Sequence, residues 1–118
     1  MATPTTFTVK NVDAAQFTAS VTTVLTVASN TNGAKITSIK VVNDSATPDA
    51  VTIYLVPSGV SPATDAHILC KAFSVPADGL PYELIGDNGA FLESAGTVQG
   101  FSVTTNTITY HISYIEFN

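Results

Sequence analysis

Two histidines and one cysteine are the side chains best suited to acid–base, nucleophilic or metal chemistry in this chain of 118 residues. His67 and Cys70 lie in one short segment, and His111 lies near the C-terminal end. A catalytic triad needs a base, a nucleophile and an orienting group in fixed geometry, and no nucleophile-elbow motif accompanies either histidine. A single cysteine excludes an intrachain disulfide and a multi-cysteine metal site, and its apolar neighbours favour a small buried side chain over a reactive thiol. We therefore expect no catalysis from these residues.

Six carboxylates lie at predicted turns and loops, and oxygen-rich loops are where calcium binds in proteins. They are Asp44, Asp49, Asp65, Asp78, Asp87 and Glu93. Only the run 87–89, Asp-Asn-Gly, reproduces a fragment of a calcium-loop pattern. Asp and Asn are favoured at turns in any case, because their side chains bond the local backbone. We therefore expect turn-making carboxylates, with no metal and no cofactor.

Sugar chemistry is the alternative that an all-β chain leaves open, since paired carboxylates hydrolyse glycosides. Sugar sites use aromatic platforms, and this chain has no tryptophan. Tyr54, Tyr110 and Tyr114 lie on predicted strands, where packing in a core or at an interface explains them. We expect no enzyme activity, and we keep a carbohydrate-binding β-sandwich as an alternative.

The charge balance argues against two classes of partner. Nine acids outweigh four lysines, there is no arginine, and the formal net charge is −5. Nucleic-acid binding neutralises phosphates with Lys and Arg, and no basic stripe exists here. A sparse negative surface gives no grip on anionic lipid, apolar runs are far shorter than a membrane span, and the first residues do not resemble a signal peptide. We expect no nucleic-acid partner, no membrane partner and synthesis in a cytoplasm.

The segment 107–117 is the clearest predicted strand, because apolar and polar residues alternate along it with period two. One face holds Ile108, Tyr110, Ile112 and Tyr114, and the other holds Thr109, His111 and Ser113. At Ile115 and Phe117 the second face also turns apolar, which predicts burial on both sides of the strand's end. Tyr114, Ile115 and Phe117 are therefore our candidate contact residues for another protein subunit.

The segment 98–104 precedes this strand, with Phe101 and Val103 on one face against Ser102 and Thr104 on the other. The short link at 105–106 contains Asn106, and Asn tolerates the positive φ of tight turns. This pattern predicts a C-terminal hairpin. The segments 35–42 and 51–56, joined by a run dense in turn formers, predict a second hairpin.

Further short strands are predicted at 22–28, 67–75, 80–85 and 91–92, giving eight or nine strands with a turn every 8 to 12 residues and no helical crossover. That spacing predicts an all-β fold: a single-domain antiparallel β-sandwich, jelly-roll-like in topology. Residues 1–20 alternate only weakly and contain Pro4, so we predict an N-terminal arm or edge strand there and the sandwich domain over 21–118.

The middle and end of the chain contain a series of strand-and-turn patterns. They are an apolar strand ending in Asn at 36–43, a strand closing in Val-Pro-Ser-Gly at 50–59, an Ile-Leu strand and Pro-Ala-Asp-Gly turn within 67–79, Tyr-Glu-Leu-Ile at 82–85, and Leu-Glu-Ser-Ala-Gly at 92–96. In these patterns residues 35–118 resemble small structural proteins of tailed bacteriophages. The chain departs from them at 77–79, where a plain Ala-Gly is usual.

The resemblance implies a virion protein, and it brings no set of functional residues. We expect a capsid decoration (cement) protein that binds the major capsid protein, or another virion protein, on the outer surface of the phage head and stabilises the assembled shell by mass action. We also expect a homotrimer, because closed rings are the usual arrangement of identical subunits. The alternative within this class is a head-fibre, tail-fibre or receptor-binding module.

Overall fold

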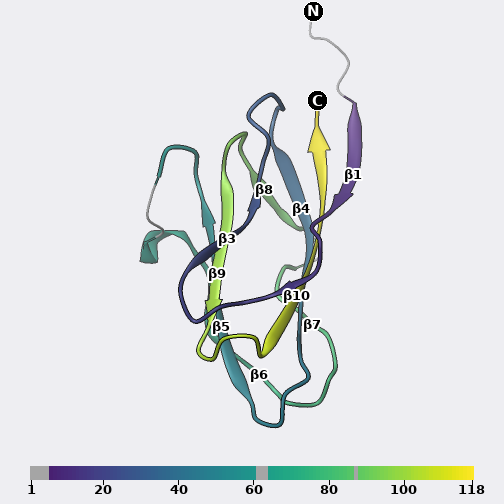
Figure 1. Ribbon diagram of the computed structural model, residues 1–118. Helices are drawn as coiled ribbons and strands as arrows, with labels where there is room; N and C mark the ends of the chain where they lie inside the picture. The colour runs from purple at the N-terminus through teal and green to yellow at the C-terminus, as the bar shows by residue number, and fades with distance from the viewer. Residues whose placement is uncertain (1–5, 61–63, 87) are drawn as a thin grey trace, which may run out of the picture.

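The computed structural model describes residues 6–60, 64–86 and 88–118, and over these residues the chain is all-β, with one short 3₁₀ turn (Figure 1). The strands are β1 (Phe7–Asn11), β2 (Ala15–Gln16), β3 (Thr22–Thr26), β4 (Ala34–Asn43), β5 (Asp49–Val56), β6 (Ile68–Val75), β7 (Tyr82–Glu83), β8 (Ala90–Leu92), β9 (Thr97–Ser102) and β10 (Ile108–Phe117). The 3₁₀ turn η1 spans Asp65–His67. The prediction of an all-β chain is confirmed.

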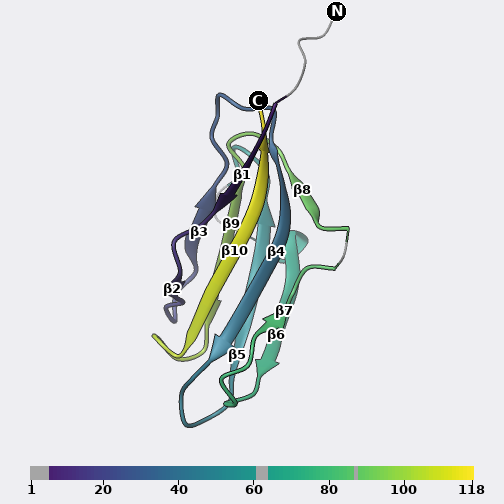
Figure 2. The ribbon, with the colours of Figure 1, turned by 90° about the vertical axis from the view of Figure 1, so that its right-hand side faces the viewer.

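The strands form two antiparallel sheets, compatible with a β-sandwich (Figure 2). The first sheet has the order β1-β10-β4-β7, with β2 also paired to β10 and β8 also paired to β4. The second sheet has the order β3-β9-β5-β6. Figure 2 shows the first sheet in front of the second, with β1 at the upper end of the first one.

The core lies between the sheets and takes one face of each long strand. On β10 the residues Ile108, Tyr110, Ile112 and Tyr114 are buried, so the inward face predicted for this strand is confirmed. Phe17, which follows β2, is fully buried and its ring centroid lies 4.8 Å from that of Tyr110. The N-terminal segment is thus tied to the core, since burying such a side chain contributes about 1.5–3 kcal/mol.

A bulge in β4 changes which residues of that strand face the core. Ser38 lies opposite Ser113 and Ile36 lies opposite Tyr114, so Thr37 is an extra residue in the ladder. Ile39 and Val41 point inward on one side of the bulge, and Ile36 points inward on the other. A bulge shifts the alternation of a strand by one residue, so the outward-facing side chains before and after it belong to two separate stretches of the strand.

Both predicted hairpins are wrong. β9 pairs with β3 and β5 while β10 belongs to the other sheet, and β4 and β5 are likewise in different sheets. The turn at Asn106 does have the expected positive φ, 63°. Each of these four strands buries one face, and the connections carry the chain across the core so that the faces pack against each other. The segment predicted as a strand at 80–85 pairs only at Tyr82–Glu83.

The inward face of β9 is the opposite of the one that apolarity suggested. Ser102 is fully buried, whereas Phe101 is half-buried and Val103 is exposed. The inward face holds Val98, Gly100 and Ser102. A side chain at position 100 would not fit, because a Cβ there would lie 2.8 Å from the Thr52 carbonyl oxygen. The buried Ser102 hydroxyl is satisfied by donating to the Thr104 carbonyl at 2.7 Å.

Candidate interaction surface

The outer face of the first sheet has an apolar half, which we call the apolar patch. It consists of Phe7, Val9, Phe91, Ile115 and Phe117. The sheet register explains why they gather. On β1 and β10, Phe7 lies opposite Phe117 and Val9 lies opposite Ile115. On the other side of β10, Ile115 lies opposite Lys35 of β4, and Lys35 lies opposite Phe91 of β8. Residues directly opposite in an antiparallel sheet project from the same face. Three strands, β1, β8 and β10, therefore contribute the patch, and β4 contributes Lys35 between Ile115 and Phe91.

Three aromatic rings form a row at the end of this patch. The centroids of Phe7 and Phe117 are 5.4 Å apart with an interplanar angle of 79°, and Phe91 stacks on Phe117 at 6.3 Å. Gly33 makes room for the row, because a Cβ there would lie 2.5 Å from the Phe91 ring. The backbone φ of Gly33 is +102°, a conformation that also favours glycine.

The patch is open to solvent. Phe7, Val9 and Phe91 are 67%, 75% and 63% exposed, and Ile115 and Phe117 are half-buried against them. Single exposed apolar residues are ordinary on protein surfaces, but a contiguous group of aromatic and aliphatic side chains marks a site of interaction.

The other half of the same face is polar. His111 lies opposite Lys40, and Lys40 lies opposite Glu83 on the next strand. The Glu83 carboxylate accepts hydrogen bonds from the Ser38 hydroxyl at 2.7 Å and from the Ile39 backbone N–H at 2.8 Å. The bulge at Thr37 lies between the polar half and the apolar patch.

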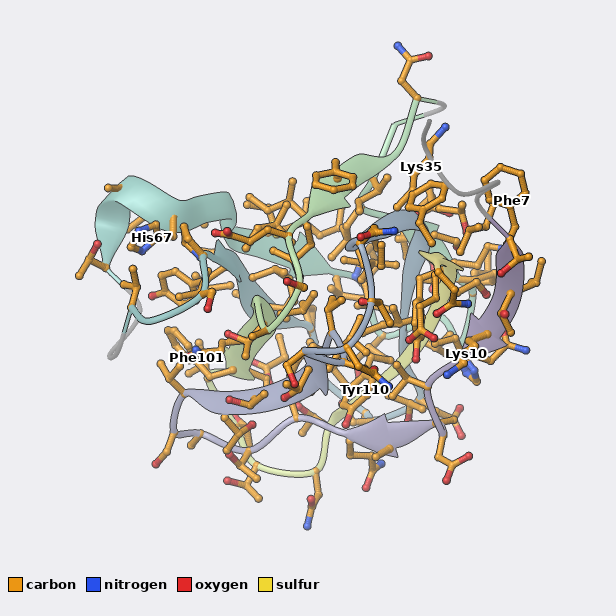
Figure 3. All side chains as sticks on the ribbon, turned by 90° about the horizontal axis from the view of Figure 1, so that it is seen from above. Phe7, Lys10, Lys35, His67, Phe101 and Tyr110 are labelled. Carbon is orange, nitrogen blue, oxygen red and sulfur yellow. The ribbon has the colours of Figure 1, made fainter. Side chains whose placement is uncertain are left out.

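The structure separates the three contact residues proposed from sequence. Tyr114 points into the core, while Ile115 and Phe117 lie in the apolar patch. Phe7, Val9 and Phe91 were missed, although the alternation Phe7-Thr-Val9 beside a polar segment was a usable signal for a strand with an apolar face. Figure 3 shows Phe7, Lys10 and Lys35 on one side of the molecule and His67 on the other.

Most carboxylates singled out from sequence hold turns, as far as their side chains are described. Asp49 accepts hydrogen bonds from the backbone N–H groups of Ala50 and Thr104 and from the Thr107 hydroxyl, so it ties the β4–β5 connection to the β9–β10 connection. Glu93 accepts a bond from the Ser58 N–H at 3.1 Å. The exposed Asp44 lies in the β4–β5 connection, Asp65 begins η1, and Asp87 lies outside the described residues.

Asp78 holds the turn between β6 and β7. Its carboxylate accepts bonds from the Tyr82 hydroxyl at 2.6 Å and from the Leu80 N–H at 3.0 Å. These bonds, the one from Tyr82 first, lower the pKa of Asp78, and the same contact raises the pKa of Tyr82.

The two histidines and the cysteine have separate surroundings in the structure. The Nδ1 atom of His67 lies 3.2 Å from the Thr64 hydroxyl at the end of η1, and His111 is exposed on β10. Cys70 is half-buried on β6, and burial raises the pKa of its thiol.

Within residues 6–60, 64–86 and 88–118 there is no group of three His, Cys, Asp or Glu side chains placed to hold a metal ion, and no enclosed pocket. No helix in this described part of the chain is long and apolar enough to cross a membrane. Comparison of the chain with protein-family models, with curated proteins and with solved structures finds no match.

Proposed function

We propose that this chain is a phage virion structural protein: a capsid decoration protein that stabilises the head by binding the major capsid protein or another virion protein, and not an enzyme. The apolar patch is the observation that carries the proposal. Its five side chains, Phe7, Val9, Phe91, Ile115 and Phe117, are gathered on one exposed face by the pairing of four strands.

The three most exposed side chains of the patch, Phe7, Val9 and Phe91, have apolar surface to bury in an interface. Fully burying an exposed Val or Phe side chain contributes about 1.5–3 kcal/mol, and the half-buried Ile115 and Phe117 contribute less. Together these contributions are comparable with the lower part of the cost of lost translational and rotational freedom on binding, about 4–15 kcal/mol. The polar half beside the patch supplies Lys40, His111 and hydroxyl groups for hydrogen bonds at the rim, as stable interfaces require.

The sandwich is a jelly roll in this proposal, and the strand pairing supports that topology. In a jelly roll the first strand pairs with the last, the second with the last but one, and so on inward. Taking β1 with β2 as one strand and β7 with β8 as another, the pairs are β1–β2 with β10, β3 with β9, β4 with β7–β8, and β5 with β6. Jelly rolls are frequent in viral capsids, a fold-level analogy that adds to the resemblance in residues 35–118.

The protein acts on the outer surface of the phage head and assembles there as a homotrimer. A net charge of −5 suits the outside of a shell better than its DNA-facing lining. Binding the assembled shell more tightly than its separate subunits stabilises the shell by mass action.

The experiment that tests this function removes the gene from the phage that encodes this chain. A decoration protein predicts heads that form normally but release DNA at a lower temperature, with heat resistance restored when purified protein is added back. Heads of unchanged heat resistance, together with lost adsorption to cells, would contradict it and favour the fibre or receptor-binding alternative.

A further inference from the structure

Strand β1 is held on one side only. Its single partner among the described strands is β10, and four of its five residues are exposed. Figures 1 and 2 show it at the border of the first sheet, beside the C-terminal end of β10. An exposed strand of this length with one neighbour gains little stability by itself.

The backbone of β1 presents a regular row of hydrogen-bonding groups to solvent. Thr6 exchanges both backbone bonds with Asn118, at 3.2 and 2.9 Å, and the Val12 N–H donates to Ile112 at 2.9 Å. Because backbone bonding alternates along an antiparallel pair, Thr8 and Lys10 also bond towards β10. The N–H and C=O groups of the intervening residues therefore point to the free edge: Phe7, Val9 and Asn11.

This edge lacks most of the features that protect edge strands from pairing. Natural edges are guarded by proline, by bulges or by free charged side chains. The β1–β10 pairing has no register shift, and the strand contains no proline. Its one charge, Lys10, is ion-paired with Glu116 at 3.1 Å, and Glu116 is almost fully buried.

We infer that β1 accepts an extended strand from the shell protein, which adds to the first sheet by main-chain hydrogen bonding. The incoming segment has alternating chemistry: apolar residues beside Phe7 and Val9 on the face of the apolar patch, and polar residues beside Lys10 on the opposite face. This inference rests on the proposed function, because it names the surface by which the decoration protein binds the head.

A second copy of β1 fits this edge less well. Two β1 strands paired antiparallel about Val9 would place both Lys10 side chains on one face, two positions apart. A foreign strand need not carry a lysine at this position, so it avoids this like-charge contact.

The substitution Val9→Pro tests the inference directly. Proline at this position removes an N–H that points to the free edge and leaves the bonds to β10 in place. Val9→Thr is the matched control, because it keeps the N–H and only reduces the apolar surface. Urea unfolding of both variants first checks that they are folded. Their binding to heads purified from a gene-deleted phage is then measured by cosedimentation.

We expect Val9→Pro to bind the heads at least roughly tenfold more weakly than the wild type, because it loses one main-chain hydrogen bond and weakens the adjacent ones. We expect Val9→Thr to bind within about threefold of the wild type. Equal binding by Val9→Pro and wild type, with wild-type binding intact, would overturn the strand-addition inference and leave the proposed function standing. If the wild type self-associates and Val9→Pro abolishes that association, the strand that pairs with β1 belongs to a second copy of the chain, and the inference is wrong. Failure of the wild type to bind heads would overturn the proposed function itself.

Discussion

Phe7 and Phe117 meet edge to face at opposite ends of the chain, with their ring centroids 5.4 Å apart. The contact depends on the β1–β10 pairing, which places the first described strand beside the last. Two of the five patch residues, Phe7 and Val9, therefore lie near one terminus, and two, Ile115 and Phe117, lie near the other. The complete patch forms only when β1 pairs with β10, so we expect binding through the patch to depend on that pairing.

The apolar patch is expected to contribute to binding more than to folding. Phe91→Ser removes a 63% exposed ring, so we expect the free energy of unfolding to change by less than about 1 kcal/mol, as is usual for surface substitutions. Binding to heads should weaken at least several-fold. The matched control is Val103→Ser, which removes a 66% exposed side chain at the end of β9, outside the patch. Equal loss of binding in both variants would contradict a specific role for the patch.

Gly33 is expected to tolerate no side chain. In Gly33→Ala the new Cβ would lie 2.5 Å from the Phe91 ring and 2.9 Å from the Leu92 carbonyl oxygen, at a φ of +102°. We expect a loss of about 2–4 kcal/mol in the free energy of unfolding, measured by urea denaturation. Gly59→Ala has a similar φ of +79° but no atom within 4 Å, so it should lose only about 1 kcal/mol. Equal losses would show that crowding at Phe91 is unimportant.

Asp49 is expected to matter for stability because it joins two connections at one end of the sandwich. Asp49→Ala leaves the N–H groups of Ala50 and Thr104 without their acceptor, and we expect a loss of about 2–4 kcal/mol in the free energy of unfolding. Asp44→Ala, at an exposed position in the same connection, should stay within about 0.5 kcal/mol of the wild type. A small effect of Asp49→Ala would mean that the turns are held by other contacts.

Asp78 is expected to titrate below the ordinary aspartate range, because the Tyr82 hydroxyl and the Leu80 N–H bond its charged form. With the folded pKa below the unfolded one, these bonds stabilise the turn above the unfolded pKa, and the contribution is lost as the pH falls through the folded pKa. A carboxyl titration by NMR should show this, and Tyr82→Phe should raise the pKa towards its ordinary value. An unchanged pKa in Tyr82→Phe would contradict the stated cause.

The sequence predicted strands and turns better than it predicted their partners. The alternation in β10 and the positive φ of Asn106 follow from local chemistry, and both are present. Whether two successive strands pair or cross to opposite sheets is decided by packing across the core, so both predicted hairpins failed. On β9 the inward face holds Val98, Gly100 and Ser102 instead of Phe101 and Val103, and the alternation within that strand does not indicate this choice.

The candidate surface was predicted only in part, for the same reason. Ile115 and Phe117 stand out because they interrupt an alternating pattern, and Tyr114 was grouped with them although it belongs to the core. Phe7 and Phe91 join the patch through pairings between segments distant in sequence, which periodicity within one segment does not reveal.

The number of copies of this chain in a purified virion tests the central claim most directly. Quantitative mass spectrometry against the major capsid protein measures it. A decoration protein repeated over the symmetric shell predicts on the order of hundreds of copies per particle. A handful of copies, confined to one vertex or to the tail, would contradict the account.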